Sequence, residues 1–124
     1  MTTVTVKCLE CDVPTKNGNV YPREELQQAI DDLGGRELLV TLGYSGESID
    51  LKNVIGATKS VSIIDNYLVS DIRFCDGPLG EHVRKMLNTD SNIGVRPASI
   101  CSPPTDGTIR GIEFLYFAVV QNPA

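Results

Sequence analysis

The sequence has little positive charge for its length and no long apolar run. Its 124 residues include 11 lysines and arginines against 16 aspartates and glutamates, so the net charge is −5. Binding to a phosphate backbone needs a basic face that releases counterions, and this balance argues against nucleic acid as the main partner. No apolar segment approaches the roughly 20 residues that span a bilayer, so we expect no membrane insertion.

A secretory leader is also lacking at the start of the sequence. The first ten residues, MTTVTVKCLE, contain no basic region and no long apolar stretch. A cleaved signal peptide would have both. We therefore expect a cytosolic origin, or delivery by a route other than a cleaved leader.

Only one pair of cysteines lies close together in the sequence. Cys8 and Cys11 form a C-x-x-C pattern, whereas Cys75 and Cys101 are far apart. A structural zinc site needs a second close pair, and residues three apart in a strand point to opposite faces. We predict small buried or half-buried side chains for the cysteines, with zinc binding and thiol chemistry as the less favoured alternatives. A disulfide to a neighbouring subunit would require an oxidising medium.

The composition that is present is that of an ordinary globular domain, with 41% hydrophobic and 22% charged residues. At this length we predict a single domain over residues 1–124. Alternating and continuous apolar segments predict about six strands, and two amphipathic stripes predict two helices. The expected strands cover residues 3–8, 37–43, 54–64, 66–74, 91–102 and 108–121, and the expected helices cover about 22–33 and 75–87.

Proline, glycine and asparagine residues mark where the expected helices and strands begin, end or turn. Pro22 suits the first turn of a helix, and the glycines at 34–35 end that helix. The pair at 65–66, Asp-Asn, is expected to turn a hairpin, and Pro97 places its strand at a sheet edge or a bulge. The second helix is expected to face the core through Leu79, Val83, Met86 and Leu87.

The last expected strand is apolar on both of its faces. From Phe114 to Val120 the residues read FLYFAVV. Such a strand needs cover on both sides, as in a closed or nearly closed sheet flanked by helices. The predicted fold is therefore α+β, with a small, mostly antiparallel, β-barrel-like sheet of about six strands and two helices.

Five phrases, in order along the chain, resemble those of a known family. They are NGNVYPREELQQAI (17–30), IDLKNVIGATKSV (49–61), LVSDIRFCDGPLGEHVRKML (68–87), NIGVRPASI (92–100) and LYFAVVQNPA (115–124). Through them the sequence resembles the prohead maturation proteases of tailed phages, which are relatives of the herpesvirus assemblin. The resemblance implies a small β-barrel-like sheet packed with helices, in agreement with the residue patterns.

The resemblance also implies a serine nucleophile and a histidine base, because a serine hydroxyl needs a base to react at neutral pH. The segment matching the family's histidine loop, TLGYSGES (41–48), contains no histidine. The segment matching its G-V-S-S-R-G phrase keeps Gly94 and Val95 but has Arg96 and Pro97 in place of the serine pair. The resemblance therefore implies an inactive member without catalytic, cofactor-binding or metal-binding residues.

An active peptidase with a rearranged site is the alternative. It would use Ser99 or Ser45 as the nucleophile and His82, the single histidine of the sequence, as the base. A lone histidine beside an apolar helical stripe is more often a packing residue. We therefore predict that His82 is half-buried on the second helix, next to Val83, without a catalytic role.

The implied function is that of a non-catalytic virion protein, a capsid decoration or cement protein on the outer surface of the phage head. Its partners would be the major capsid protein or other virion proteins, and we expect a homo-oligomer. A tail, neck or baseplate adaptor with the same inactive domain is the alternative. Candidate contact residues lie on the first strand and in the loop after the second: Thr3, Thr5, Lys7, Tyr44, Ser45, Glu47 and Asp50.

Overall fold

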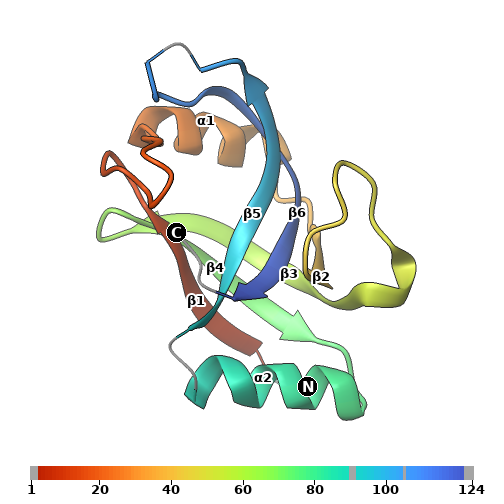
Figure 1. Ribbon diagram of the computed structural model, residues 1–124. Helices are drawn as coiled ribbons and strands as arrows, with labels where there is room; N and C mark the ends of the chain where they lie inside the picture. Colours follow the sequence, from red (N-terminus) through yellow and green to blue (C-terminus); the bar gives the residue numbers. More distant parts are fainter. Residues whose placement is uncertain (1–2, 90–91, 105, 122–124) are drawn as a thin grey trace.

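A computed structural model describes residues 3–89, 92–104 and 106–121. The start of the expected fifth strand at residue 91 and the end of the last quoted phrase, 122–124, lie outside the described residues. Within these ranges the chain forms two α-helices, six strands and one 3-10 turn (Figure 1). In chain order they are β1 (Thr3–Glu10), α1 (Arg23–Leu33), β2 (Leu39–Leu42), η1 (Leu51–Asn53), β3 (Val54–Ile64), β4 (Tyr67–Phe74), α2 (Pro78–Thr89), β5 (Ile93–Ser102) and β6 (Arg110–Gln121).

The strands form one curled sheet with the shape of a half-barrel (Figure 1). Their order across the sheet is β1-β4-β3-β2-β6-β5. All neighbouring pairs are antiparallel except β2 and β6, which run parallel. The curl brings the two edge strands, β1 and β5, near each other. The predicted α+β fold with a mostly antiparallel, barrel-like sheet is confirmed.

The two helices lie at opposite ends of the sheet (Figure 1). Helix α1 packs mainly on β6 and also on β3, whereas α2 packs on β3, β4 and β5. Helix α1 begins after Pro22 and ends at Gly34, whose φ of 59° is left-handed, as glycine permits at a helix end. Its buried face consists of Leu26, Ala29 and Leu33. The predicted end and amphipathic character of this helix are confirmed, and the helix starts one residue later than expected, because Pro22 is its N-cap.

The β3–β4 hairpin and the edge position of β5 also agree with the sequence. Asp65 and Asn66 have φ angles of 51° and 67°, and two left-handed residues match the twist of a tight hairpin. Pro97 lies on β5, an edge strand, opposite Phe117, and the register shifts just after it, between Ala98 and Ser99. Both the edge and the bulge that a strand proline predicts are therefore present.

Strand β6 supplies much of the core. Between β5 and β2 it runs through the middle of the molecule, and Tyr116, Phe117 and Ala118 are completely buried. Phe114 and Phe117 lie with their ring centroids 5.8 Å apart. Consecutive buried residues mean that both faces of the strand are covered, as its apolar sequence predicts.

Helix α2 differs from the prediction at its first turn. Leu79, expected on the core face, is 45% exposed, and Gly80 is buried in its place, whereas Val83 is buried as expected. Gly80 lies so close to the chain before the helix that a Cβ there would overlap the carbonyl oxygen of Cys75. The helix therefore packs through its smallest residue, and this rotates Leu79 outward.

The cysteines also differ in part from the prediction. Cys8 and Cys11 are buried in the same hydrophobic core, not on opposite faces, because the register of β1 shifts between Lys7 and Leu9 and the strand ends at Glu10. Cys75 and Cys101 are exposed, contrary to the prediction, since they lie just after β4 and near the end of the edge strand β5. Burial raises the pKa of the Cys8 thiol to about 12, so this thiol stays protonated at neutral pH.

Candidate functional site

The two segments to which the resemblance assigns the catalytic pair meet at one hollow in the surface. The loop after β2 forms one wall and β5 forms another, and the hollow has a volume of about 520 Å³. Residues from the turn before α1 complete its rim. The lining consists of Asn17, Tyr21, Tyr44, Gly46, Glu47, Arg96, Pro97, Ala98, Ser99, Ile100 and Leu115.

The loop after β2 is held in place by a buried tyrosine of β6. The hydroxyl of Tyr116 donates to the carbonyl oxygen of Gly46 at 2.7 Å and accepts from the amide of Ser45 at 3.0 Å. The tyrosine is fully buried and packs with Ala98 and Ala118, and Ile49 covers this small cluster. The loop wall of the hollow is therefore fixed by a contact from a strand about 70 positions later in the sequence.

Replacing Tyr116 with phenylalanine should loosen this loop and leave the rest of the fold in place. The change leaves the Ser45 amide and the Gly46 carbonyl without their partner, so we expect a loss of about 1 kcal/mol in the free energy of unfolding. Amide hydrogen exchange at Ser45 should become faster. Tyr44→Phe, which removes a hydroxyl from an exposed residue of the same loop, should change neither quantity. Equal effects of the two variants would show that Tyr116 does not hold the loop.

The position that the sequence resemblance matches to a nucleophilic serine holds a cation, Arg96. Arg96 is half-buried on β5 and lines the hollow. Its Nε atom is buried without a hydrogen-bond partner among the described residues. Burial raises the pKa of Tyr44, and the nearby Arg96 guanidinium partly counters that rise. Because a guanidinium donates hydrogen bonds and remains charged, this wall of the hollow can attract a carboxylate but cannot accept a proton.

The two serines considered as rearranged nucleophiles have different surroundings. Ser99 is half-buried on β5 and lines the hollow. Ser45 is exposed, and its hydroxyl donates to the Ser48 carbonyl at 2.6 Å, so this side chain closes its own loop. Ser99 is therefore the serine that a ligand in the hollow could reach.

The single histidine does not belong to the hollow. His82 is exposed on α2, so the predicted half-buried packing position is wrong. The helix faces the core through Gly80 and Val83, three positions apart, and this spacing turns His82 toward solvent. It is not among the residues that line the hollow.

The predicted contact residues of β1 lie on its exposed face, where two of them already bind a neighbouring strand. The hydroxyl of Thr5 donates to Asp71 at 2.5 Å, and the ammonium group of Lys7 lies 4.5 Å from the centroid of the Tyr67 ring. Thr3 is exposed at the beginning of the strand. Since β1 is an edge strand and pairs only with β4 among the described strands, one of its backbone edges has no strand partner, although β5 comes near it.

Of the loop residues predicted as contacts, some are exposed on the surface and one stabilises the loop itself. Tyr44 is 53% exposed, and Ser45 and Glu47 are exposed beside it. Asp50 is half-buried and accepts from the amide of Lys52 at 3.1 Å at the start of η1. Tyr44 and Glu47 face the hollow, whereas Asp50 stabilises the end of the loop.

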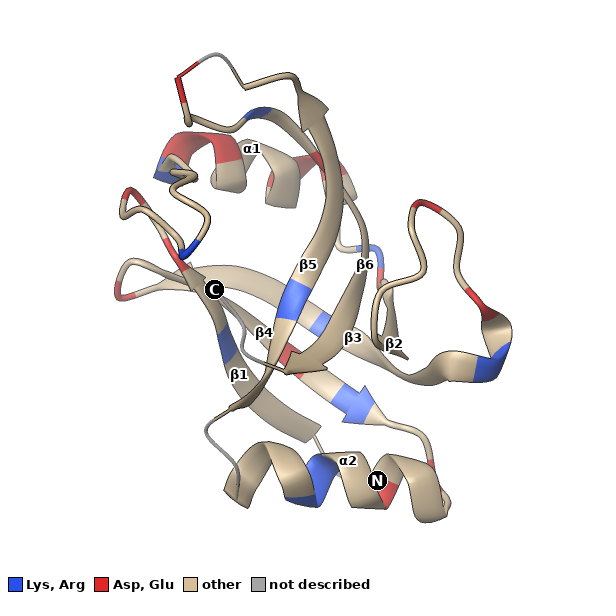
Figure 2. Ribbon diagram, viewed as in Figure 1, with Lys and Arg blue, Asp and Glu red and all other residues tan. Residues whose placement is uncertain are grey.

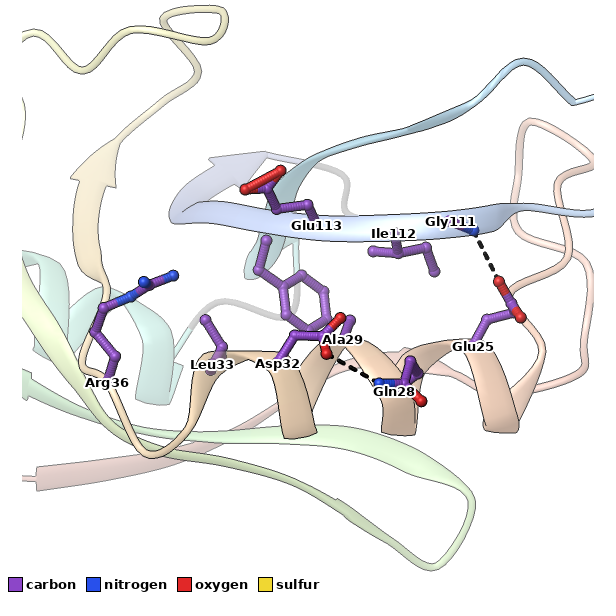
Figure 3. A pocket seen from close by; sticks show the side chains of 10 residues that line it. Glu25, Gln28, Ala29, Asp32, Leu33, Arg36, Gly111, Ile112 and Glu113 are labelled. Carbon is purple, nitrogen blue, oxygen red and sulfur yellow. Dashed lines mark hydrogen bonds between the residues drawn. The ribbon is translucent and has the colours of Figure 1, made fainter.

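A second concave site, not predicted from the sequence, lies between α1 and β6 (Figure 3). This groove has a volume of about 440 Å³. The carboxylate of Glu25 crosses one end of it and accepts from the amide of Gly111 at 2.8 Å. In the sequence Glu25 is only an acidic residue in the first turn of a helix, and its pairing with a residue 86 positions away has no local signal.

The described residues contain neither a cluster that could bind a metal ion nor a helix that could span a membrane. In the described ranges, no three histidine, cysteine, aspartate or glutamate residues gather in a way that could hold a metal ion. Neither described helix has the length and apolarity needed to span a bilayer.

Comparison with known proteins shows a likeness to a solved structure. No family model and no curated protein matches the sequence. Among solved structures, the capsid assembly protease gp21 of bacteriophage T4 is similar, with a TM-score of 0.79 and 16% sequence identity. The match covers 98% of this chain and 82% of that chain. At this identity the likeness shows the fold alone, which is prohead protease-like.

Proposed function

We propose that this chain is a non-catalytic structural protein of a phage particle and that it decorates the outer surface of the head shell. The phage setting is supported by the prohead protease-like fold and the likeness to a capsid assembly protease. The resemblance of the sequence phrases to prohead proteases supports the same setting. Binding to the major capsid protein or another virion protein then takes the place of peptide cleavage.

The observation that carries this proposal is the presence of Arg96 and Pro97 on the wall of the hollow where the family has its serine pair. A covalent mechanism needs a nucleophile and an adjacent base. The lining of the hollow contains Ser99 but no histidine, and His82 is exposed on α2. Loss of the base and displacement of the nucleophile together would remove most of the catalytic rate.

Binding of this chain to another virion protein is supported by exposed apolar side chains on the segment that leads from β2 to β3. Leu42 is 42% exposed, Tyr44 is 53% exposed and Leu51 is 78% exposed. The segment projects from the side of the sheet (Figure 1) and is anchored by Tyr116. Exposed apolar and aromatic residues on a fixed scaffold are typical of protein interfaces. The free edge of β1 offers a second place for self-association or partner binding.

A serine-directed fluorophosphonate tests the non-catalytic part of the proposal. After incubation with the intact chain, mass spectrometry should show no covalent adduct, whereas a known serine hydrolase in the same reaction should be labelled. A stoichiometric adduct that disappears in Ser99→Ala would contradict the proposal. It would favour the alternative of an active peptidase, because Ser99 is the candidate nucleophile that lines the hollow.

A further inference from the structure

Strand β6 has a free edge along the first half of its length. On one side β5 pairs with it from Arg110 to Gln121. On the other side β2 pairs with it only from Phe117 to Val119. Among the described residues, no strand pairs with residues 110–116 on that side. Helix α1 lies beside this edge (Figure 3), and the groove is the space between them.

The groove combines an apolar floor with a mainly acidic rim. The floor consists of Ala29, Leu33, Ile112 and Phe114, which are all at most 8% exposed. The charged groups of the rim are the carboxylates of Glu25, Asp32 and Glu113 and the guanidinium of Arg36, so the local charge is −2 (three negative and one positive). Gln28 lies between the acids of the helix and donates to Asp32 at 2.9 Å. Figure 2 shows how strongly acidic residues dominate α1.

At one point a side chain of α1 already binds the free edge of β6. Glu25 accepts from the Gly111 amide, and so it satisfies a backbone donor that a neighbouring strand would otherwise bind. A side chain that supplies this hydrogen bond can be displaced by a backbone carbonyl. Beyond Glu25 the groove continues past Ile112 toward Arg36 (Figure 3).

We propose that the groove binds an extended segment of another protein that alternates apolar residues with lysine or arginine. The segment adds to the free edge of β6 in the row that β2 occupies further along, with its apolar side chains on the floor and its cationic ones against the acidic rim. Backbone hydrogen bonds give the affinity, and the charge of the rim selects basic over acidic segments. This site shares no lining residue with the hollow at β5 and goes beyond the proposed function.

Two blocked synthetic peptides provide the probe, one alternating valine with lysine and the other valine with glutamate. Titrated into the intact isotope-labelled chain, the lysine peptide should shift the backbone amide signals of residues 111–114, and the glutamate peptide should not. The affinity should fall as salt is raised, because the charges are exposed and screened. Equal binding of both peptides, or no shift at residues 111–114, overturns the proposal. Shifts there on raising the protein concentration alone would identify a second copy as the occupant and overturn it too.

Asp32 and Asp31 offer a matched pair of variants. Asp32 lines the groove and Asp31 does not, and each accepts from a glutamine four residues earlier, Gln28 and Gln27. A lysine at either position lies near the helix C-terminus, where positive charge is favourable, so both variants should fold. Asp32→Lys should weaken binding of the lysine peptide by about threefold to tenfold, whereas Asp31→Lys should leave it unchanged. Equal weakening by both variants would mean that the net charge of the chain, not the groove, is responsible.

Discussion

Replacing Phe117 with alanine should lower the free energy of unfolding by roughly 3–5 kcal/mol. Phe117 is fully buried in the one stretch of β6 that has strands on both sides, opposite Pro97 of β5 and Val40 of β2. Its ring also packs against Phe114. Truncation therefore removes apolar contacts to several elements at once, and the interior cannot easily collapse around the cavity.

Urea unfolding followed by far-ultraviolet circular dichroism measures this loss. Leu115→Ala on the same strand is a suitable control, because its side chain is only half-buried, and it should cause a clearly smaller loss. If the two substitutions destabilise equally, or if Phe117→Ala costs less than about 1 kcal/mol, the side chain is not packed as the structure has it.

Gly80→Ala should destabilise the protein although it places the best helix former inside a helix. On helix propensity alone the change should stabilise by about 1 kcal/mol. In the structure the added Cβ overlaps the carbonyl oxygen of Cys75 and lies 3.2 Å from its carbonyl carbon. Backbone atoms cannot move aside as a flexible side chain can, so α2 must shift off the sheet. We expect a net loss of about 2–3 kcal/mol.

The sign of the change in the free energy of unfolding of Gly80→Ala decides whether helix propensity or the steric overlap with Cys75 dominates. Asn88→Ala on the exposed side of the same helix isolates propensity and should be neutral or slightly stabilising. A stabilising Gly80→Ala would show that α2 does not approach the chain before it at this point. Thermal unfolding of the two variants beside the parent chain gives the comparison.

Local patterns in the sequence were sufficient for most of the fold. A stripe at helical spacing fixes the buried face of α1, and the turn at 65–66 and Pro97 place a hairpin and an edge strand. Such features depend on a few neighbouring residues. The parallel pairing of β2 with β6 and the shared core position of Cys8 and Cys11 depend instead on distant strands and on a register shift. Periodicity within one segment contains no information on either.

The location of the candidate site was predictable from the sequence, but the contacts that hold its loop in place were not. The resemblance placed the loop after β2 and the segment around Arg96 at one site, and the structure brings them together in the hollow. The Tyr116 contacts that fix the loop join positions about 70 residues apart, so no motif reveals them. The groove beside β6 exists because β2 is only four residues long. Its acidic rim comes from two elements that meet only in the folded chain.

Quantitative mass spectrometry of purified phage particles tests the central claim that this protease-like chain acts by adhering to the shell. The proposed function predicts hundreds of copies of the intact chain in each finished particle. A few copies per particle would indicate the tail, neck or baseplate adaptor instead. Absence of the chain from finished particles would contradict the account.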